Sequence, residues 1–213
     1  MSELAYKRLV GTKKKILDAA LIEFSINGLA GARVDRIASE SGVNKAMIYY
    51  HFNSKENLYE EVINRLFTSV AQHVDKFLSE MTDPVTIFTK IAEYYYSISR
   101  EFENFIPMFL HDLADGGERI KIGIEKAFVL NDLPKKIIAF MEKCKAEGTI
   151  RDIDSRHAML SFIGMNKFFL LVAPIFGHIW DIEDENKFRA ERPRAVVDLF
   201  LHGILEKKNE NPL

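Results

Sequence analysis

A short stretch of the chain combines basic, aromatic and small residues in a pattern that suits contact with nucleic acid. Residues 45–52 form a short segment rich in polar and aromatic side chains, including Lys45, Tyr49, Tyr50 and His51. A short helix of this kind can present its N-terminal end to the major groove of DNA. This stretch is the strongest candidate for a functional surface, and the surrounding elements must hold it toward solvent.

The residues around this stretch predict a helix-turn-helix. Two short helices are expected over residues 34–41 and 45–51, with Gly42 in the turn and Asn44 as the cap of the second helix. Glycine suits the turn because it adopts positive φ without steric cost. The inward-facing residues that would clamp both helices onto a preceding helix at 12–28 are Val34, Ile37, Ala38, Val43, Ile48 and Phe52.

The segment from about residue 12 to residue 60 resembles the DNA-binding domain of the TetR family of bacterial transcriptional regulators. Its matching pieces keep the family's spacing jointly: Ile37-Ala38, Gly42-Val43, Ile48-Tyr49-Tyr50-His51-Phe52 and Ser54-Lys55-Glu56-Asn57-Leu58. The resemblance implies that Lys45 and Ala46 meet base edges and that Tyr49 and Tyr50 touch phosphates or bases. It also implies that His51 and Lys55 contact phosphates, with Lys55 at the start of a helix whose backbone N–H groups can assist.

Two positions depart from the family's pattern. Arg33 stands where the family usually has threonine at the start of the second helix, so it cannot accept a backbone hydrogen bond as a cap, although it can reach a phosphate. Ala46 stands where glycine is frequent, and its extra methyl group is expected to alter which base is accepted.

Composition and charge fit a DNA-binding regulator that works in the cytoplasm. The chain has 213 residues, of which 47% are hydrophobic, so a packed core can form. Residues 1–57 contain nine basic and six acidic side chains, whereas the whole chain carries a net charge of −2. The single cysteine, Cys144, suits a reducing compartment, and we find neither an apolar run long enough to span a membrane nor a signal segment.

Hydrophobic periodicity predicts an all-α protein of about nine helices, without convincing strand patterns. We expect an N-terminal helix-turn-helix domain over residues 1–55 and a helical ligand-binding and dimerisation domain over residues 56–213. A long helix joins the two. The later helices are expected over residues 54–81 and 84–102, in a short segment opened by Pro107, over 154–179, and from Pro193 to about Lys208. Between Gly117 and Gly148 we expect either one helix or a helix that is bent or interrupted at residues 131–134.

The second domain is rich in aromatic and methionine side chains, most of which are expected to form its core. The family resemblance implies a pocket among its helices for a hydrophobic or aromatic small molecule. The predicted pocket residues are Tyr95, Phe105, Met108, Phe109, His111, Phe140, Met165, Asn166 and Phe169. No His, Asp or Glu spacing suits a metal site, so neither a metal nor a cofactor is predicted.

The resemblance also implies a homodimer in which the last two helices of each chain form a four-helix interface. The predicted interface residues are Phe162, Phe168, Leu171, Val196, Leu199, Phe200, Gly203 and Ile204. Two-fold symmetry would place two recognition helices one DNA turn apart, which requires a palindromic operator.

The resemblance implies a ligand-responsive regulator that binds operator DNA as a homodimer. By the family's default it is a repressor that a small molecule releases from DNA, and an activator, or a repressor that needs its ligand in order to bind, is the alternative. One alternative is an all-helical enzyme acting on a hydrophobic substrate, but the sequence contains no nucleophile elbow, no phosphate-binding glycine loop and no evident acid–base pair. Another is a protein-interaction adaptor whose helix-turn-helix domain no longer binds DNA. Ligand turnover would favour the enzyme, and binding that depends on neither salt nor sequence would favour the adaptor.

Overall fold

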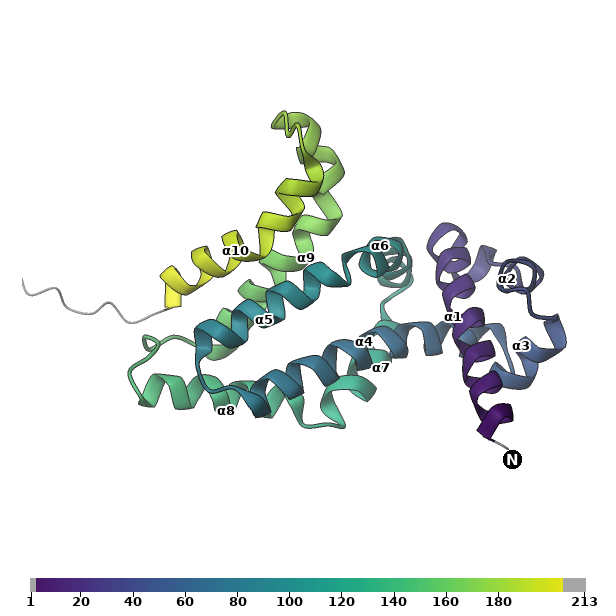
Figure 1. Cartoon of the computed structure of the whole chain (residues 1–213), viewed down its shortest axis with the longest axis horizontal. Coiled ribbons are helices and arrows are strands. Elements are labelled where there is room, and N and C mark those ends of the chain that lie inside the picture. Colours follow the sequence, from purple (N-terminus) through teal and green to yellow (C-terminus); the bar gives the residue numbers. More distant parts are fainter. Residues whose placement is uncertain (1–2, 205–213) are drawn as a thin grey trace, which may run out of the picture. The chain divides into compact units, whose positions relative to one another are not determined.

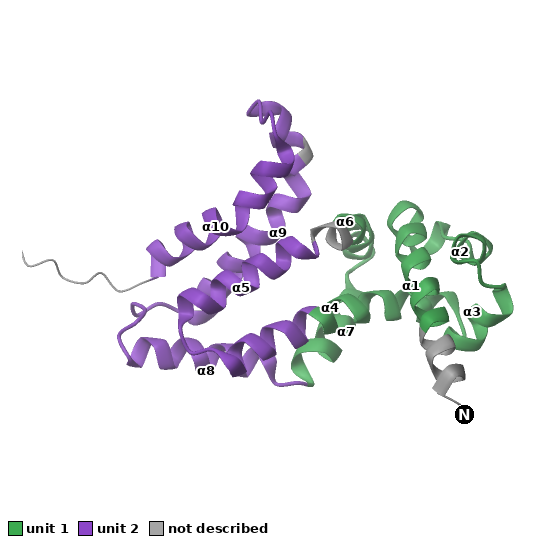
Figure 2. Ribbon diagram, in the orientation of Figure 1, with its two compact units in different colours: residues 1–69, 101–130 green, residues 70–100, 131–213 purple. Residues whose placement is uncertain are grey.

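The computed structural model describes residues 3–204, except the side chains of residues 3–10, 99–102 and 174. The described part contains ten α-helices, one short π-helix and no strand (Figure 1). The predicted all-α class is confirmed, and the predicted end of the last helix at Lys208 lies outside the described residues. The chain folds as two compact units: residues 1–69 with 101–130, and residues 70–100 with 131–213 (Figure 2). These are packing units, so the functional division after residue 55 stays a prediction.

The first unit contains the predicted helix-turn-helix domain, here called the head. Helix α1 (Glu3–Gly31), α2 (Val34–Ser41) and α3 (Lys45–Phe52) enclose a core to which each contributes. Its buried side chains include Ile16, Phe24, Ile37, Ile48 and Phe52. Both short helices lie where the sequence predicts them. Gly42 ends α2 and Asn44 begins α3, in agreement with the preferences of these residue types.

Two residues fix the turn between the short helices of the head. Gly42 adopts the left-handed conformation (φ 65°), and its backbone N–H closes the end of α2. The side chain of Asn44 accepts a hydrogen bond from the Met47 backbone N–H at 2.8 Å and so caps α3. Val43 and Ala38, predicted to face inward, are half-buried.

The first unit also includes the start of α4 (Lys55–Glu80), most of α6 (Ser99–Ala114), α7 (Glu118–Ile124) and the π-helix η1 (Glu125–Val129). The Tyr59 hydroxyl of α4 donates to the Met108 carbonyl of α6 at 3.2 Å, and its ring packs edge-on against Phe24 of α1. The buried carboxylate of Asp112 accepts a hydrogen bond from the Ile120 backbone N–H at 2.9 Å. The head and these helices therefore share one packed unit.

The second unit consists of the remainder of α4 with α5 (Pro84–Ser97), α8 (Leu133–Ala146), α9 (Ser155–Ile179) and α10 (Glu185–Ile204). Three phenylalanine rings form its centre: Phe88 of α5, Phe162 of α9 and Phe200 of α10 lie 4.9–5.0 Å apart between ring centroids. All three side chains are buried. Helices α5, α9 and α10 are thus joined through one aromatic cluster.

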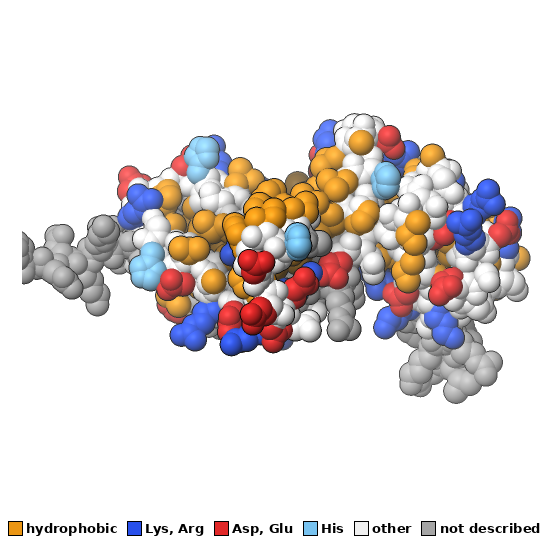
Figure 3. Space-filling view, turned by 90° about the horizontal axis from the view of Figure 1, so that it is seen from above, with side chains coloured by type: hydrophobic (Ala, Val, Ile, Leu, Met, Phe, Trp, Pro, Cys, Tyr) orange, Lys and Arg blue, Asp and Glu red, His pale blue; other side chains and the backbone are white. Residues whose placement is uncertain are grey.

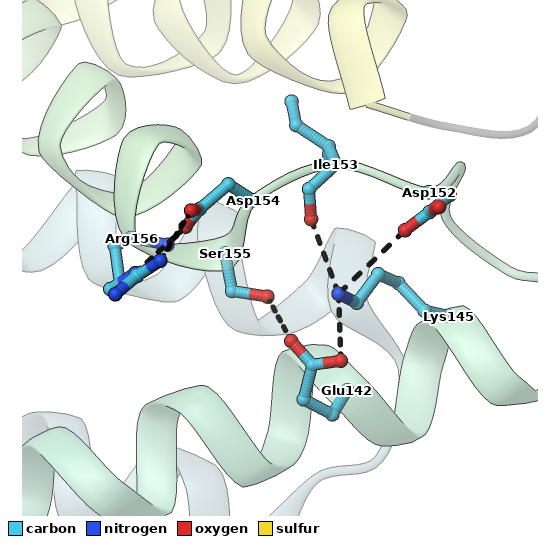
Figure 4. A network of polar contacts seen from close by, with 7 residues as sticks. All are labelled: Glu142, Lys145, Asp152, Ile153, Asp154, Ser155 and Arg156. Atoms are coloured by element: carbon cyan, nitrogen blue, oxygen red, sulfur yellow. Dashed lines mark hydrogen bonds and ion pairs between the residues drawn. The ribbon is translucent and has the colours of Figure 1, made fainter.

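A polar network fixes the start of α9 (Figure 4). Glu142 of α8 accepts a hydrogen bond from the Ser155 hydroxyl at 2.7 Å and pairs with Lys145 at 2.7 Å. The Lys145 ammonium lowers the pKa of the Glu142 carboxyl. Asp154 caps α9 as predicted, accepting from the Arg156 backbone N–H at 2.8 Å, and its pKa is lowered by hydrogen bonds from Arg156. The start of α9 is therefore both capped and tied to α8.

Four predicted helix boundaries are wrong, and the first is the start of α1, which begins at Glu3 rather than at residue 12. Pro107 and Pro193 do not open helices but lie inside α6 and α10. α10 begins two turns before Pro193 because the Asp184 carboxylate accepts a hydrogen bond from the Lys187 backbone N–H at 2.9 Å and caps the helix there. Pro193 itself is buried, and packing compensates for its missing hydrogen bond. α5 ends at Ser97, five residues before its predicted end.

Candidate nucleic-acid interface

Helix α3 has a buried face and an exposed face. Ile48 and Phe52 are enclosed in the core of the first unit. Lys45, Ala46, Tyr49 and Tyr50 are exposed, with 71% of Tyr50 and 42% of Tyr49 accessible to solvent. Large aromatic side chains are rarely this exposed without a partner, so the exposed face of α3 is a candidate binding surface. The predicted base-reading residues all lie on it.

Lys45 forms an ion pair on this surface. Its Nζ lies 2.8 Å from Oδ1 of Asp35 in α2, and the hydrogen bond from Nζ to Oδ2 is 3.0 Å long. The hydrogen bond to Asp35 raises the pKa of Lys45 above its ordinary value, so the ammonium is charged throughout the physiological range. Any contact between Lys45 and DNA must compete with this pair.

Replacement of Asp35 by asparagine is therefore expected to increase affinity for duplex DNA about two- to fivefold, as is usual for the loss of an exposed ion pair. The substitution frees Lys45 and removes a negative charge that phosphates would repel. Fluorescence anisotropy with a labelled duplex at fixed salt measures this change, and Asp75→Asn, which breaks an ion pair with Lys136 in the second unit, serves as the matched control. A lower affinity of the Asp35 variant would instead mean that Asp35 positions Lys45 for binding.

The start of α2 is capped in a way that the sequence did not reveal. Arg33 is exposed and extended (φ −118°, ψ 122°), and its side chain makes no cap, as expected from its chemistry. Instead, the Arg33 backbone N–H donates to Oε1 of Glu23 in α1 at 2.9 Å. Glu23 is one of few buried charged side chains, and its only sequence signal is a carboxylate beside Phe24 on the buried stripe of α1. The Arg33 guanidinium stays available for a phosphate.

The two remaining predicted phosphate contacts are more enclosed. Lys55 is half-buried, and its Nζ donates to the carbonyl oxygens of Ala30 at 3.4 Å and Ala32 at 3.2 Å, which hold the end of α1. His51 is also half-buried, and its Nε2 is buried without a hydrogen-bond partner. These two side chains support the head as well as bordering its exposed face, and their contacts with phosphate remain predictions.

The predicted ligand-binding residues fall into both compact units. Phe105 and Met108 are buried in the first unit, where Phe109 is half-buried and His111 is exposed beside Gly28. In the second unit, the structure brings Tyr95, Asn166 and Phe169 together around a cavity of about 20 Å³. Met165 and Phe169 also line a groove of about 740 Å³, whereas Phe140 is half-buried on α8 and lines neither space. The structure thus places only part of the predicted set around an open space.

The predicted dimer-interface residues need correction. Phe162, Val196, Phe200 and Ile204 are buried in the core of the second unit, so they have no surface to offer a second copy. Apolar residues repeat on two faces of each helix, and the sequence periodicity did not separate the inner face from the outer one. The other predicted interface residues, which are exposed, are Phe168, Leu171, Leu199 and Gly203.

An exposed apolar stripe runs along α9. It consists of Leu160, Gly164, Phe168, Leu171, Ile175 and Ile179, spaced by three or four residues, and is here called the α9 stripe. Its large side chains are 41–68% accessible. No described helix is long and apolar enough to cross a membrane. A contiguous apolar stripe that is exposed along a helix is characteristic of a protein interface.

Comparison with known proteins places these features among transcriptional regulators. A family model described as bacterial regulatory proteins of the tetR family matches residues 16–62, which include the whole helix-turn-helix. The HTH-type transcriptional repressor NicS of Pseudomonas putida is 24% identical over 159 residues, covering 74% of this chain and 75% of NicS. The HTH-type transcriptional regulator RutR of Escherichia coli K12 is 28% identical over 171 residues, covering 78% of each chain.

A solved structure has the same fold over most of its length. The transcriptional regulator FadR from Bacillus subtilis, in complex with stearoyl-CoA, superposes with a TM-score of 0.67 at 16% identity. The match covers 89% of this chain and 98% of FadR. The likeness extends beyond the helix-turn-helix to the helices of both compact units.

Proposed function

Because this chain belongs to the TetR family of bacterial regulatory proteins, we propose that it is a repressor that binds a palindromic operator as a homodimer and releases it when a hydrophobic or aromatic small molecule binds. The observation that carries this proposal is the exposed face of α3, which presents Lys45, Ala46, Tyr49 and Tyr50 together. A helix with this face can enter the major groove, where each base pair has a distinct pattern of donors and acceptors.

The residues of this surface are proposed to have two roles, base reading and phosphate contact, according to their chemistry. Lys45 and Ala46, in the first turn of α3, are the base-reading residues that we propose. Arg33 and Tyr50 are the proposed exposed phosphate contacts, and Lys55 and His51 contribute at the edge of the surface. Phosphate contacts fix the position and register of the head, whereas base contacts select the sequence.

Binding to a duplex of mixed sequence tests the electrostatic part of this proposal without knowledge of the operator. The affinity, measured by anisotropy between 50 and 200 mM salt, is expected to fall steeply, because each phosphate neutralised releases counterions. Arg33→Gln, which removes a proposed phosphate contact, is expected to reduce the slope of log K against log salt by about one per copy of α3 engaged, whereas Lys135→Gln, an exposed lysine of the second unit, leaves it unchanged. Affinity that is independent of salt and identical in both variants would contradict DNA binding and favour the adaptor.

The α9 stripe supports the homodimer. Two-fold packing of this stripe against its counterpart would bury the large apolar side chains that the single chain leaves exposed, and Leu199 of α10 can add to the same interface. The symmetric dimer would carry two copies of α3, which fits half-sites whose centres are about 34–36 Å apart. Sedimentation velocity of Ile175→Asp tests this interface, and the variant is expected to be monomeric at concentrations where the parent protein is a dimer.

Release by a ligand requires a free-energy coupling between the ligand site and the head. We propose that ligand binding shifts α4, which contributes residues 55–69 to the first unit and 70–80 to the second. A coupling of about 1–3 kcal/mol would change operator affinity about 5–150-fold. The stearoyl-CoA complex of the Bacillus subtilis regulator supports a ligand with a long apolar part.

A further inference from the structure

An ion pair joins the two short helices of the head at the exposed face of α3. The ammonium Nζ of Lys45, the first residue of α3, lies 2.8 Å from Oδ1 of Asp35 and 3.0 Å from its Oδ2. Asp35 is the second residue of α2, and 76% of its side chain is accessible to solvent, compared with 48% for Lys45. Both charged groups can therefore contact a molecule that binds to this face.

The Lys45–Asp35 pair differs from an ordinary surface ion pair in two respects. Basic and acidic side chains lie beside one another on the head (Figure 3), and most such pairs have little effect. This pair, however, includes one of the proposed base-reading residues. In addition, Glu23 holds the start of α2 through the Arg33 backbone N–H, so Asp35 is not needed as a cap. Within the described part of the chain, the Asp35 carboxylate accepts hydrogen bonds from Lys45 alone, and it keeps lone pairs for another donor.

The positions of both charged groups are fixed before DNA binds. Ile37 of α2 and Ile48 of α3 are buried in the core of the head, and Gly42 and Asn44 fix the turn between the helices. The ion pair in turn restrains the flexible side chain of Lys45. A donor and an acceptor are thus presented side by side, which reduces the conformational entropy lost on binding.

A base pair presents the complementary arrangement in the major groove. In a G·C pair, guanine offers the acceptors O6 and N7, and cytosine offers a hydrogen of its N4 amino group. O6 and N4 are joined by a Watson–Crick hydrogen bond of about 2.9 Å. The distance between Nζ of Lys45 and Oδ1 of Asp35 is 2.8 Å, so the two edges match in spacing. The ammonium has three hydrogens and can donate to O6, and the hydrogen bond that the carboxylate accepts from N4 offsets the competition for Lys45.

We propose that the Lys45–Asp35 pair reads the orientation of one base pair in each half-site, with guanine facing Lys45 and cytosine facing Asp35. Asp35 is thereby a specificity-determining residue, although it lies outside α3. This inference rests on the proposed binding of operator DNA through α3, and it adds the identity of a base pair that the head selects.

The other three arrangements of a base pair fit less well. A reversed pair, with cytosine facing Lys45, places an amino group against the ammonium and guanine O6 against the carboxylate. A pair with adenine facing Lys45 has the same mismatch, since thymine O4 then meets the carboxylate. A pair with thymine facing Lys45 keeps the pattern of acceptor and donor but lacks guanine N7. Asp35 therefore excludes bases by repulsion as well as selecting cytosine.

The test uses the full-length protein and the half-site that it enriches from a random duplex library. Each G·C pair of the enriched half-site is reversed in turn, in both half-sites, and binding is measured by fluorescence anisotropy at one salt concentration. At the pair that Asp35 reads, reversal is expected to weaken binding of the parent protein about 5- to 150-fold per half-site, the usual effect of losing a good base contact.

Two variants show whether Asp35 causes this discrimination. Asp35→Ala is expected to reduce the ratio at that pair at least about fivefold, because the reversed pair no longer meets a carboxylate. Glu40→Ala is the matched control, since Glu40 is an exposed carboxylate of α2 that forms no ion pair with a described residue. It should change the affinity for all duplexes alike and leave the ratio unchanged. The gain in affinity expected for Asp35→Asn likewise concerns all base pairs together, whereas this prediction concerns their ratio.

A change in the DNA alone provides an independent measurement. N4-methylcytosine still pairs with guanine, but its methyl group replaces the amino hydrogen that faces the major groove. At the pair that Asp35 reads, this base is expected to weaken binding of the parent about 10-fold or more, as the loss of a hydrogen bond to a charged group predicts. The affinity of Asp35→Ala should not change, since this variant has no carboxylate to accept that hydrogen.

Two outcomes would overturn the proposal while operator binding stands. The first is that the parent and Asp35→Ala have the same ratio at every G·C pair of the half-site. The second is that N4-methylcytosine weakens both proteins equally. In either case the parent still enriches a palindrome, and Asp35 is only a surface charge. If the parent enriches no sequence, the proposed function fails and this inference fails with it.

Discussion

Phe162→Ala is expected to lower the free energy of unfolding by about 3–5 kcal/mol, a large part of the stability of a domain of this size. The Phe162 side chain has no exposed surface, and its ring contacts both Phe88 and Phe200. Removing it leaves a cavity at the point where α5, α9 and α10 meet. Urea unfolding followed by circular dichroism at low protein concentration measures the loss.

Ile175→Ala provides the matched control for Phe162. This residue lies on the same helix, but 59% of its surface is exposed, so the cost to the unfolding of a single chain is expected to be below about 1 kcal/mol. Its effect should appear instead as a higher dissociation constant of the dimer. If the two variants had equal unfolding free energies, the assignment of Phe162 to the core rather than to the interface would be wrong.

Tyr50→Ala is expected to reduce operator affinity about 10- to 150-fold for each head engaged, the usual effect of losing a hydrogen bond to a charged group. Because the proposed dimer would place two copies of α3 on one operator, the combined loss should be about 100-fold or more. Tyr50 is 71% exposed, so its removal leaves the stability of the head within about 0.5 kcal/mol of the parent.

Two further variants show how Tyr50 contacts DNA and whether the effect is specific to it. Tyr50→Phe removes only the hydroxyl, so it should match the alanine variant if the hydroxyl contacts a phosphate and resemble the parent if the ring stacks on a base. Tyr96→Ala removes a partly exposed tyrosine of α5 and should leave DNA affinity unchanged. Full affinity in Tyr50→Ala would remove this residue from the DNA-binding surface.

The head was largely predictable because its signals are local. Gly42 and Asn44 fix the turn and the cap through their own backbone and side-chain preferences, and Ile48 and Phe52 mark the buried face of α3 by spacing alone. The ion pair between Lys45 and Asp35 was not predicted, since it joins two helices through side chains ten residues apart. The same holds for Glu23, whose role at the start of α2 depends on where α1 lies.

The second unit was predicted less well for a physical reason. Along α9 and α10 apolar residues occur on both faces, so periodicity did not separate Phe162, which packs inward, from Phe168, which is exposed. The prolines also led to wrong helix boundaries. Proline is a typical first residue of a helix, but α10 begins before Pro193 because Asp184 caps it there. The groove lined by Met165 and Phe169 depends on the pairing of α9 with α10, which no local pattern reveals.

The most direct test of the central claim is selection of bound sites from a random duplex library, using the purified protein at a stated salt concentration. A repressor with two α3 helices related by two-fold symmetry predicts enrichment of a palindrome whose half-site centres lie one helical turn, or a multiple of it, apart. The same selection with Tyr50→Ala should yield no such motif. If the folded, dimeric parent protein enriched no sequence, the proposal that this chain reads operator DNA through α3 would be contradicted.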